Sequence, residues 1–471
     1  SKSAPLTFLS PEDVEGIHTA TLQILSEIGV LMTHTQAREI LSGAGARVDR
    51  DRVRIPADVV ESALSGCPAT LALRGRNGQV ELLGDGKLHW HNLGGARDVF
   101  EPETGQCRPA QTTDVAQAAR LLDALPNCTA VTPFFTPQDV PGALMSLAMY
   151  RHTLPHTLKP IQGPGVQTAA EVSYIARMAE VAGPPGERLS LGISPISPLT
   201  FPDEITAAII ETARLGIPFG PLPCPTAGAT APLSLAGALA QQNAEVLASI
   251  VLAQLAHPGL PVYYCGRLAM LEPRSGGSTW GGVELGLVSA GTVQIAHRYG
   301  MPVNVYGLST NAHNLGLQNG FERALNAAIP ALAGADELSG IGEMSAGVTG
   351  SFAQMVIDDE IAAGVRRLGR AFAVDADTLA VEVIANVMDG GHNFISEAHT
   401  VKHLRAGEIL VAKLAERRGW DEWEKSGQEG MPERAQAKAA KLLAEHQVEP
   451  LSQAQESELD AILRAAQAEL A

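Results

Sequence analysis

Residues 261–308 read PVYYCGRLAMLEPRSGGSTWGGVELGLVSAGTVQIAHRYGMPVNVYGL, and this stretch decides the predicted fold class. The apolar run at residues 261–267 predicts a buried strand, and the run at residues 302–308 predicts a second one. Between them, residues 283–300 carry apolar side chains at helical spacing. A strand, a helix and a strand in this order predict a parallel βαβ unit.

The same alternation extends over most of the chain. Further short apolar runs that predict strands lie at residues 128–135, 158–163, 189–196, 217–223 and 337–342. Long helical segments separate most of them, and several strands begin on Pro or Gly. This repetition predicts an α/β fold with a closed (β/α)₈ TIM barrel rather than an open sheet. Seven strands are assigned in this way, and the eighth is not.

Changes in the pattern of apolar and charged residues along the chain predict three domains or segments. Residues 1–110 open with a helix and continue with short strands and turn signals, which predicts a small β-rich N-terminal extension. Residues 111–373 form the barrel. Residues 374–471 are helical and highly charged, which predicts a segment packed on the outside of the barrel or on a partner.

Composition excludes several functional classes. The formal net charge of −17 argues against nucleic acid or an anionic membrane as a partner. No apolar run reaches the roughly 20 residues that span a bilayer, and the longest, residues 246–256, predicts a buried helix. No GxGxxG or Walker motif follows the strands, which weakens a nucleotide-binding interpretation. Five scattered cysteines without metal spacing and an N-terminus without an apolar signal core predict a cytoplasmic protein.

In a parallel barrel the active site lies at the carboxyl ends of the strands. This rule selects a set of candidate residues from the predicted strands and the loops after them: Phe134, Gln162, Tyr264, Arg267, Tyr306, Asn311, His313 and Glu343. Trp280 between glycines and Trp90 after a turn are added as aromatic candidates. For the tyrosines, packing in the core is an equal alternative, and Trp280 could anchor a loop instead of forming a wall of the site.

Charged candidates need separate consideration. Glu343 follows a strand among small residues, where a carboxylate is costly unless it is paired or functional. The acidic run at residues 358–360 lies within a helical pattern and is interpreted as a cap or surface cluster. His89 and His91 have the spacing of metal ligands on a strand, but no third ligand is evident, so no metal site is expected.

Several long blocks resemble the trimethylamine methyltransferase family. They include TPFFTPQDVPGALMSLAMY at residues 132–150, STNAHNLGLQNGFERALNAAIPALAGA at residues 309–335 and GEMSAGVTGSFAQMVIDDEIAAGVRRLGRAF at residues 342–372. GGHNFISEAHT at residues 390–400 matches as well, and the resemblance covers nearly the whole chain.

The resemblance implies a barrel enzyme that moves a methyl group from a methylated amine to the cobalt of a separate corrinoid protein. Cobalamin is then supplied by this transient partner, and no tightly bound cofactor is expected. Archaeal members carry pyrrolysine near the position of Leu308 or Ser309, where this chain has only standard residues. The chain therefore resembles the non-pyrrolysine branch, which is known for quaternary amines such as glycine betaine.

A quaternary ammonium leaves as a neutral tertiary amine, so the enzyme needs to orient and desolvate a cation rather than protonate it. Aromatic faces bind such cations, and Trp280, Tyr264, Tyr306 and Trp90 are the predicted cage, with Phe134 as an outer wall. Arg267 stands where relatives have small residues and is predicted to bind a substrate carboxylate. The alternative for Arg267 is a surface ion pair with Glu272 or Glu284.

The loop after the sixth predicted strand departs from the family pattern. Where relatives carry an acidic and a basic residue, this chain has Asn311 and His313, so Asn311 is predicted to bind substrate and His313 joins Glu343 as a catalytic candidate. Alternative functions are a methyltransferase for a tertiary amine, a barrel lyase that uses Glu343 as a base, and a non-catalytic binding protein for a methylated amine. The substrate, the corrinoid partner and assembly into a homo-oligomer stay open.

Overall fold

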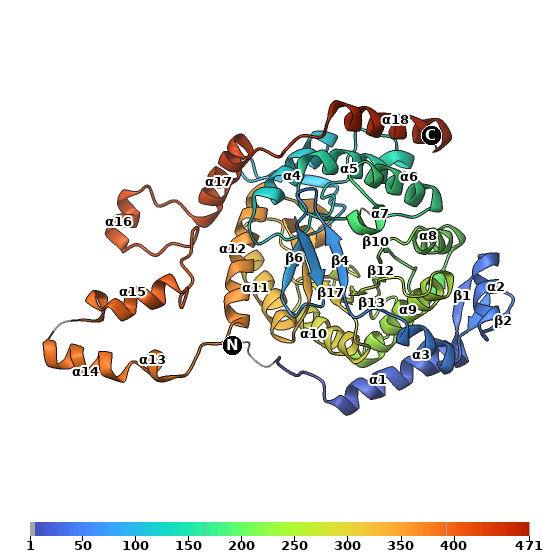
Figure 1. The fold of residues 1–471 in the computed structure, drawn as a ribbon, viewed down its shortest axis with the longest axis horizontal. Coiled ribbons are helices and arrows are strands. Elements are labelled where there is room, and N and C mark those ends of the chain that lie inside the picture. Colours follow the sequence, from blue (N-terminus) through green and yellow to red (C-terminus); the bar gives the residue numbers. More distant parts are fainter. Residues whose placement is uncertain (1–4, 164, 392, 471) are drawn as a thin grey trace.

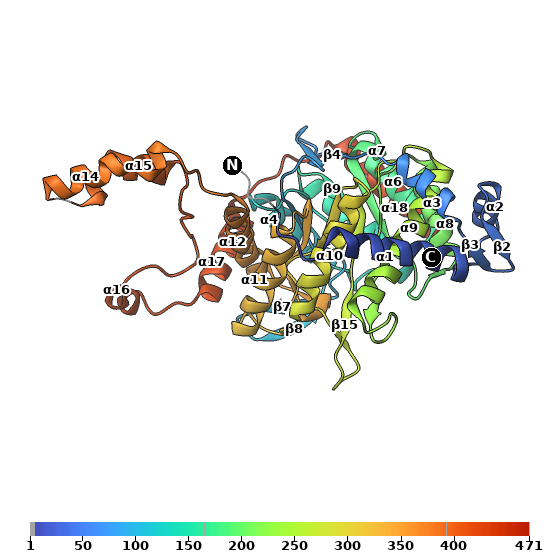
Figure 2. The same cartoon turned by 90° about the horizontal axis from the view of Figure 1, so that it is seen from below.

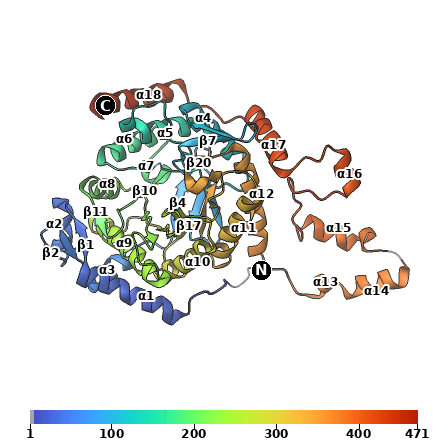
Figure 3. The ribbon, with the colours of Figure 1, turned by 180° about the vertical axis from the view of Figure 1, so that it is seen from behind.

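The computed structural model describes residues 5–163, 165–391 and 393–470. It has a mixed α/β fold with a rounded body and an arm that projects from one side of it (Figure 1). Helices lie around the outside of the body, and the strands lie inside (Figures 1 and 3). Six of the seven predicted runs contain a strand, and the run at residues 128–135 contributes an isolated parallel bridge at Val131.

Parallel strands form the centre of the body, in two sheets. One sheet has the order β14-β17-β18-β6, with β14 at Tyr264–Gly266, β17 at Val303–Tyr306, β18 at Glu337–Ile341 and β6 at His89–Asn92. The other has the order β12-β10-β9, with β12 at Phe219–Pro221, β10 at Leu189–Ile193 and β9 at Ile161–Gln162. All pairs within these two sheets are parallel.

Isolated parallel bridges connect the two sheets. Phe219 of β12 pairs with Val262, just before β14, and Val131 pairs with Ile161 of β9. The segment before Val131 in turn meets β6, because the backbone N–H of Thr129 donates to the carbonyl of Trp90 at 2.7 Å. Strands that follow one another in the chain are therefore neighbours in space.

The strand His89–Asn92 lies on the far side of the predicted boundary at residue 110. The sequence predicts these residues as part of the N-terminal extension, yet the strand pairs in parallel with β18 in the central sheet. Its sequence, His-Trp-His-Asn, lacks the apolar run expected of a buried strand. All four residues are nevertheless buried. His91 and Asn92 of this strand carry polar side chains and line a cavity at the strand ends. The strand therefore does not form an apolar run that would predict it from the sequence.

Helices follow the parallel strands and cover them. In chain order they are α4 (Thr112–Ala124), α5 (Met145–Thr153), α6 (Ala169–Glu180), α8 (Asp203–Arg214), α9 (Leu235–Ala256), α10 (Val283–Arg298), α11 (Leu317–Leu332) and α12 (Phe352–Gly369). Side chains at the N-caps fix several of their starts. Thr168 caps α6 in a capping box with Glu171, and Ser351 caps α12.

Helix α9 is long and apolar enough to cross a membrane by length and composition, and among the described residues it is the one helix that meets this test. However, 83% of its apolar window is buried inside the protein. It is covered by α8 and by α1 (Pro11–Gln23) and α3 (Ala57–Ser65) of the N-terminal part. Its apolar character on all sides thus reflects a position in the core.

The remaining N-terminal elements attach to the body at several places. Strand β1 (Val30–Met32) pairs with β11 (Thr200–Phe201) and β3 (Arg52–Arg54), which also pairs with β2 (Arg47–Asp49). The hairpin β4 (Leu71–Arg74) and β5 (Val80–Leu83) contributes leucines to a small cluster with Tyr263 and Cys265. These contacts make the N-terminal part a cover for the body, together with α2 (Thr35–Gly43) and the π-helical turn η1 (Ile24–Ile28).

Short strands and turns surround the carboxyl ends of the parallel strands. The hairpin β7 (Asp98–Glu101) and β8 (Gln106–Pro109) pairs with β20 (Thr349–Gly350), which pairs with β19 (Glu343–Met344). A second group pairs β13 (Thr226–Ala227), β15 (Ala269–Leu271) and β16 (Ser278–Thr279). Short helices complete the connections: η2 (Gly142–Leu144), η3 (Leu154–His156), α7 (Pro185–Arg188) and η4 (Ser345–Gly347).

The C-terminal segment is helical, as predicted, but only part of it packs on the body. Helix α17 (Met431–Glu445) lies against α12 and α4, and α18 (Gln453–Leu470) lies against α5 and α6. Residues 371–412, here called the arm, project away from the body in both views (Figures 1 and 2). The arm carries α13 (Ala376–Leu379), α14 (Val381–Gly390), η5 (Phe394–Ser396) and α15 (Ala398–Arg405), and α16 (Trp420–Lys425) follows it.

Candidate active site

A cavity of about 390 Å³ opens where the parallel strands end. This volume is in the range of small-molecule sites. Side chains from several strands converge on it, including those of His91, Gln162, Tyr263, Cys265, Asn304, Tyr306 and Ser339. Arg267, one residue after β14, lines it as well. The cavity therefore combines aromatic surface with a single guanidinium, the Glu171 carboxylate and several neutral hydrogen-bonding groups.

The alternation of side chains along each strand decides which residues reach the cavity. Tyr263 and Cys265 line it, whereas Tyr264 between them is fully buried on the other face. The hydroxyl of Tyr264 donates to Oδ1 of Asn243 on α9 at 2.9 Å. Tyr264 is thus part of the packing between strand and helix, and the tyrosine beside it, Tyr263, is the one that lines the cavity.

Trp90 and Phe134 are also buried away from the cavity. Trp90 lies between His89 and His91 on β6 and points to the opposite face of the strand, with no exposed surface. Phe134 packs edge-to-face on Phe135, with 4.6 Å between ring centroids. Neither side chain lines the cavity, so the structure assigns both to the core instead of to the cage and its outer wall.

Arg267 is a buried cation, only 5% exposed. Its Nη1 donates to the carbonyls of Gly266 and Asn304 at 2.9 and 3.1 Å, and its Nη2 donates to the Ser339 hydroxyl at 3.1 Å and to the Asn304 amide oxygen. The guanidinium also lies over the Tyr306 ring, 4.5 Å from the centroid. All of these groups are neutral.

The alternative of a surface ion pair for Arg267 is wrong. Glu272 binds Arg274 instead, at 2.8 Å, on the exposed hairpin that follows. Arg267 is instead a buried residue of the cavity lining.

His91 lines the cavity as a neutral imidazole. Burial and the nearby Arg267 lower its pKa to about 3. The amide N–H of Asn304 donates to Nε2 at 2.8 Å, which leaves the proton on Nδ1, 3.2 Å from the Thr132 hydroxyl. His91 therefore provides hydrogen-bonding surface without a charge at neutral pH.

Glu337 lies at the bottom of the same network. Its carboxyl accepts from the Gln162 and Asn304 amides at 2.5 Å each. Complete burial, together with the neighbouring Glu81 carboxyl, raises its pKa to about 8. Gln162, a predicted binding residue, both lines the cavity and connects it to this carboxyl.

Trp280 and Asn311 join two loops beside the cavity. The Trp280 ring packs edge-on against Tyr306, with 5.1 Å between centroids. Oδ1 of Asn311 accepts from the backbone N–H groups of Trp280 and Gly281 at 2.6 and 2.7 Å. Neither residue is among those that line the cavity. Trp280 thus supports the ring of Tyr306, and Asn311 holds the Trp280 loop in place.

The two predicted catalytic residues lie outside the cavity lining. Glu343 is 1% exposed, accepts from the Thr310 N–H at 3.3 Å, and has its pKa raised to about 7 by burial. His313 is exposed, and its Nδ1 lies 2.8 Å from the Ser345 hydroxyl. Glu343 and His313 are therefore placed to hold the loops at the mouth of the cavity and not to contact a ligand inside it.

A buried ion pair holds the loops after β17 and β18. Arg323 of α11 and Asp358 of α12 are 3.0 Å apart, and both side chains have no exposed surface. Arg323 donates to the Leu308 carbonyl at 2.8 Å, and Asp358 accepts from the Gly342 N–H at 2.7 Å. The interpretation of Asp358 as part of a surface cluster is therefore wrong, because it is a core residue.

The whole chain, residues 1–471, matches the family model described as "Trimethylamine methyltransferase (MTTB)". The chain belongs to the trimethylamine methyltransferase family. Among named members, "Trimethylamine methyltransferase MttB" of Desulfitobacterium hafniense (strain DSM 10664 / DCB-2) is 33% identical over 459 residues, which cover 95% of this chain and 91% of that protein. The protein is accordingly a methyltransferase.

Other members of the trimethylamine methyltransferase family are named for two substrates. "Trimethylamine methyltransferase MttB" of Methanosarcina thermophila is 30% identical, with 95% of this chain and 94% of that protein covered. "Glycine betaine methyltransferase" of Desulfitobacterium hafniense (strain Y51) is 31% identical, with 97% and 95% covered. Identities this similar do not separate the two named substrates.

A solved structure shares the fold. The monomethylamine methyltransferase MtmB of Methanosarcina barkeri superposes with a TM-score of 0.52 over 94% of this chain and 89% of that one. Only 12% of the residues are identical, so the likeness concerns the fold alone.

In this member of the family, many cavity residues were not among the predicted binding residues, including Tyr263, Asn304, Ser339 and His91. Tyr263, Asn304 and His91 each lie one or two positions from a predicted residue, whereas Ser339 lies four positions before Glu343. Side chains alternate along a strand, so every second residue faces the same side. Counting back by twos from Tyr306 and from Arg267 leads to Asn304 and Tyr263. Leu308 and Ser309, the positions compared with pyrrolysine, are buried and do not line the cavity.

Proposed function

We propose that the protein is a corrinoid-dependent methyltransferase that demethylates a quaternary amine bearing a carboxylate, such as glycine betaine. Arg267 carries this proposal. A buried guanidinium whose hydrogen-bond partners are all neutral offers the charge and the planar donors that a carboxylate needs. The lowered pKa of His91 and the raised pKa of Glu337 both reduce the charge that surrounds Arg267, which supports a role for its guanidinium toward a ligand.

The chemistry of a quaternary amine fits the groups around the cavity. Its nitrogen already carries the positive charge and leaves as a neutral tertiary amine, so no general acid is required. Glu343 and His313, the acid–base candidates, do not line the cavity. The alternative of a lyase that uses Glu343 as its base is disfavoured, because Glu343 does not line the cavity.

The arrangement also suggests how the substrate is oriented. With its carboxylate on Arg267, the trimethylammonium group points toward the open mouth of the cavity. Tyr306 and Tyr263 provide aromatic surface in the lining of the cavity, and Met145 and Met149 add polarisable surface. The face of Tyr306 below Arg267 is already covered, so the cation uses the remaining surface. Such fixed orientation is the main contribution that this chain's own residues make.

The methyl acceptor in this proposal is a corrinoid carried by a separate protein that docks transiently at the mouth. The cobalt of that corrinoid supplies the nucleophile. The loops after the strands, held by Asn311 and by the Arg323–Asp358 pair, form the docking surface. We expect the purified protein to lack the visible absorbance of a corrinoid, and absorbance at near-equal stoichiometry would contradict this.

The proposal includes a closed (β/α)₈ barrel that begins with β6. Its support is the chain-order pairing of parallel strands, the bridges at Val131 and Val262, and the return of β18 to β6. The domain boundaries then shift, with the barrel starting near residue 89 instead of 111. Free cysteines throughout the described chain agree with a cytoplasmic location. Association into a homo-oligomer stays a prediction, to be measured by sedimentation.

Transfer of a methyl group from glycine betaine to cob(I)alamin tests the function. We expect Arg267→Met to lower kcat/KM for glycine betaine by roughly 100-fold or more, because a buried charged contact is lost. Arg274→Met is the matched control, since Arg274 lies on the same segment but is exposed and paired with Glu272. Choline lacks the carboxylate. If choline is a substrate, its kcat/KM should fall much less in the Arg267→Met variant than that of glycine betaine.

Trimethylamine serves as the competing substrate, because several family members carry its name. Faster turnover of trimethylamine than of glycine betaine would replace the proposed substrate by a tertiary amine. Equal losses for choline and glycine betaine in Arg267→Met would remove the role of Arg267 as a carboxylate ligand. If glycine betaine binds but no methyl group is transferred, the protein would be a non-catalytic binding protein for a methylated amine.

A further inference from the structure

The arm has no hydrophobic core of its own. Among its described residues, which exclude residue 392, only Val387 is buried. Large apolar side chains such as Phe372, Ile395 and Val411 are more than 60% exposed. Helices this short are not stable in water without tertiary contacts. Something other than apolar burial must hold α13 and α15 against each other.

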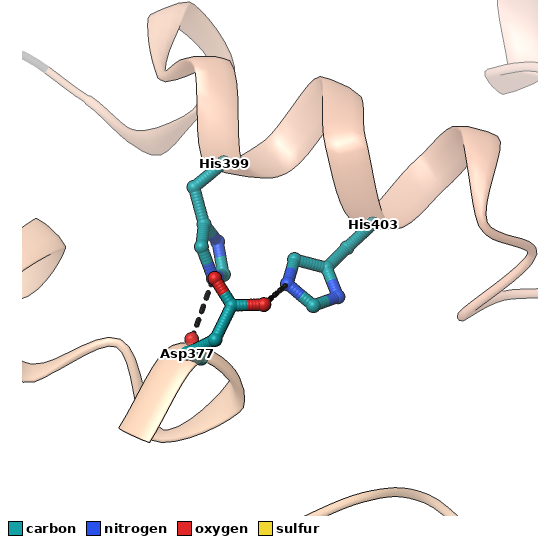
Figure 4. Close-up of side chains that lie close together, drawn as sticks. All are labelled: Asp377, His399 and His403. Atoms are coloured by element: carbon teal, nitrogen blue, oxygen red, sulfur yellow. Dashed lines mark hydrogen bonds and ion pairs between the residues drawn. The ribbon is translucent and has the colours of Figure 1, made fainter. Parts of the chain in front are cut away.

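Three side chains that can bind a metal meet between these two helices. His399 and His403 lie one turn apart on α15, and Asp377 faces them from α13 (Figure 4). One ligand atom from each lies within 4.8 Å of the others. The imidazole rings have centroids 4.2 Å apart, so both rings share one face of the helix. No other part of the described chain brings three such groups this close.

The distances within this cluster suit a tetrahedral ion. Nε2 of His403 lies 3.3 Å from Oδ2 of Asp377. Two ligands at roughly 2.0–2.1 Å from a tetrahedral zinc ion are separated by roughly 3.3 Å. This Nε2 is buried, and among the described residues it makes no hydrogen bond apart from its contact with the Asp377 carboxylate. A metal ion between the two groups would replace this long contact by two ligand bonds.

The remaining contacts are compatible with binding. Nε2 of His399 lies 2.9 Å from the backbone carbonyl of Asp377, the type of bond that commonly orients a metal-bound histidine. Lys402 reaches both oxygens of Asp377 at 2.7 Å. It is an exposed and flexible side chain, and a surface ion pair of this kind is weak. Lys402 therefore competes with a metal ion without excluding it.

We propose that Asp377, His399 and His403 form a zinc site that ties α13 to α15. A water molecule would complete the four ligands, since the chain supplies three. The ion would replace the missing core of the arm, as structural zinc does in other small folded units. This site is separate from the cavity at the strand ends and does not depend on the function proposed for that cavity.

Calorimetric titration of the tag-free, metal-stripped full chain with Zn²⁺ tests the site. We expect one Zn²⁺ per chain, and His399→Ala and His403→Ala should each weaken binding by more than about 100-fold, since even outer groups cost 10- to 100-fold. Lys402→Met should tighten binding several-fold, because it removes the competing cation. His257→Ala, an exposed histidine at the end of α9, is the control and should change nothing.

Hydrogen exchange gives a second readout that does not depend on affinity. Zn²⁺ should slow exchange over residues 376–405 in the wild-type chain and in His257→Ala, but not in His403→Ala. Thermal unfolding of the body verifies that the variants fold. Zinc bound equally well by the histidine variants would be an adventitious ion only and would overturn the proposal. No binding at micromolar Zn²⁺, or weaker binding by Lys402→Met, would overturn it as well.

Discussion

At the scale of single residues, adjacent positions on a strand have opposite roles. Tyr263 lines the cavity, and Tyr264 packs under α9. The same division separates His91 from Trp90, and Asn304 from Val303 and Val305. A cavity built from strand ends therefore takes every second side chain, and chemical type alone does not identify the members.

The two tyrosines Tyr264 and Tyr306 should respond differently to substitution. Tyr264→Phe should destabilise the protein by about 1–2 kcal/mol, because Oδ1 of Asn243 loses its donor, and leave KM unchanged. Tyr306→Leu should raise KM for a quaternary amine several-fold by removing an aromatic wall. Urea unfolding and steady-state kinetics measure the two effects. A change in KM with Tyr264→Phe would return that residue to the site.

Glu343 should make stability depend on pH. Burial raises its folded-state pKa to about 7, so its contribution to stability is present at low pH and lost as the pH rises through 7. The loss should be of the order of 3 kcal/mol between pH 5 and pH 8. Glu343→Gln should flatten this decline in urea unfolding measured over the same pH range. An equally steep decline in the variant would show that other carboxyls cause it.

At the scale of elements, α11 and α12 support the mouth of the cavity. Their ion pair, Arg323 with Asp358, reaches the backbone after β17 through Leu308 and the backbone after β18 through Gly342. Helices on the outside thereby position loops at the strand ends. This explains how a residue that never contacts a ligand can matter to the site.

Breaking the ion pair from one side should be more harmful than removing it. Arg323→Met should cost about 3–5 kcal/mol of stability, because Asp358 stays buried without its partner. The double variant Arg323→Met/Asp358→Leu should cost less than the sum of the two single variants. Unfolding free energies from the four proteins of the cycle measure this. Additive costs would mean that the pair is not coupled.

At the scale of the whole molecule, the body and the arm are held differently. Apolar burial holds the body, with α9 at its most enclosed place. The arm is anchored at its two ends, where Arg367 donates to the Glu408 carbonyl and Glu360 accepts from the N–H groups of residues 413–415. Its middle projects into solvent (Figure 2).

Removal of the arm should therefore leave the body folded. Replacing residues 373–411 by a flexible glycine–serine linker should change the melting temperature of the body by only a few degrees, since among the described arm residues only Val387 is buried. Scanning calorimetry of both proteins measures this. A large drop would show that the arm covers part of the body in solution, for example on a second copy of the chain.

Much of the fold could be predicted from the order of its segments. Alternation of apolar runs with helical segments predicted the α/β class, and long blocks around residues 132–150 and 309–335 predicted the family to which the chain belongs. Gln162, Tyr306 and Arg267 were chosen by the rule that sites lie at strand ends, and all three line the cavity. Their roles toward a substrate stay predictions.

The sequence by itself determined the class, the family and these strand-end candidates, because local periodicity and long matching blocks depend only on the order of residues. Only the tertiary structure decided that His89–Asn92 pairs with β18, that Tyr264, Trp90 and Phe134 belong to the core, and that Asp358 is buried against Arg323. It also brought Asp377 to the histidines of α15. The physical reason is that burial and pairing arise between segments far apart in the chain, and no local pattern records which face of a strand or helix meets which neighbour.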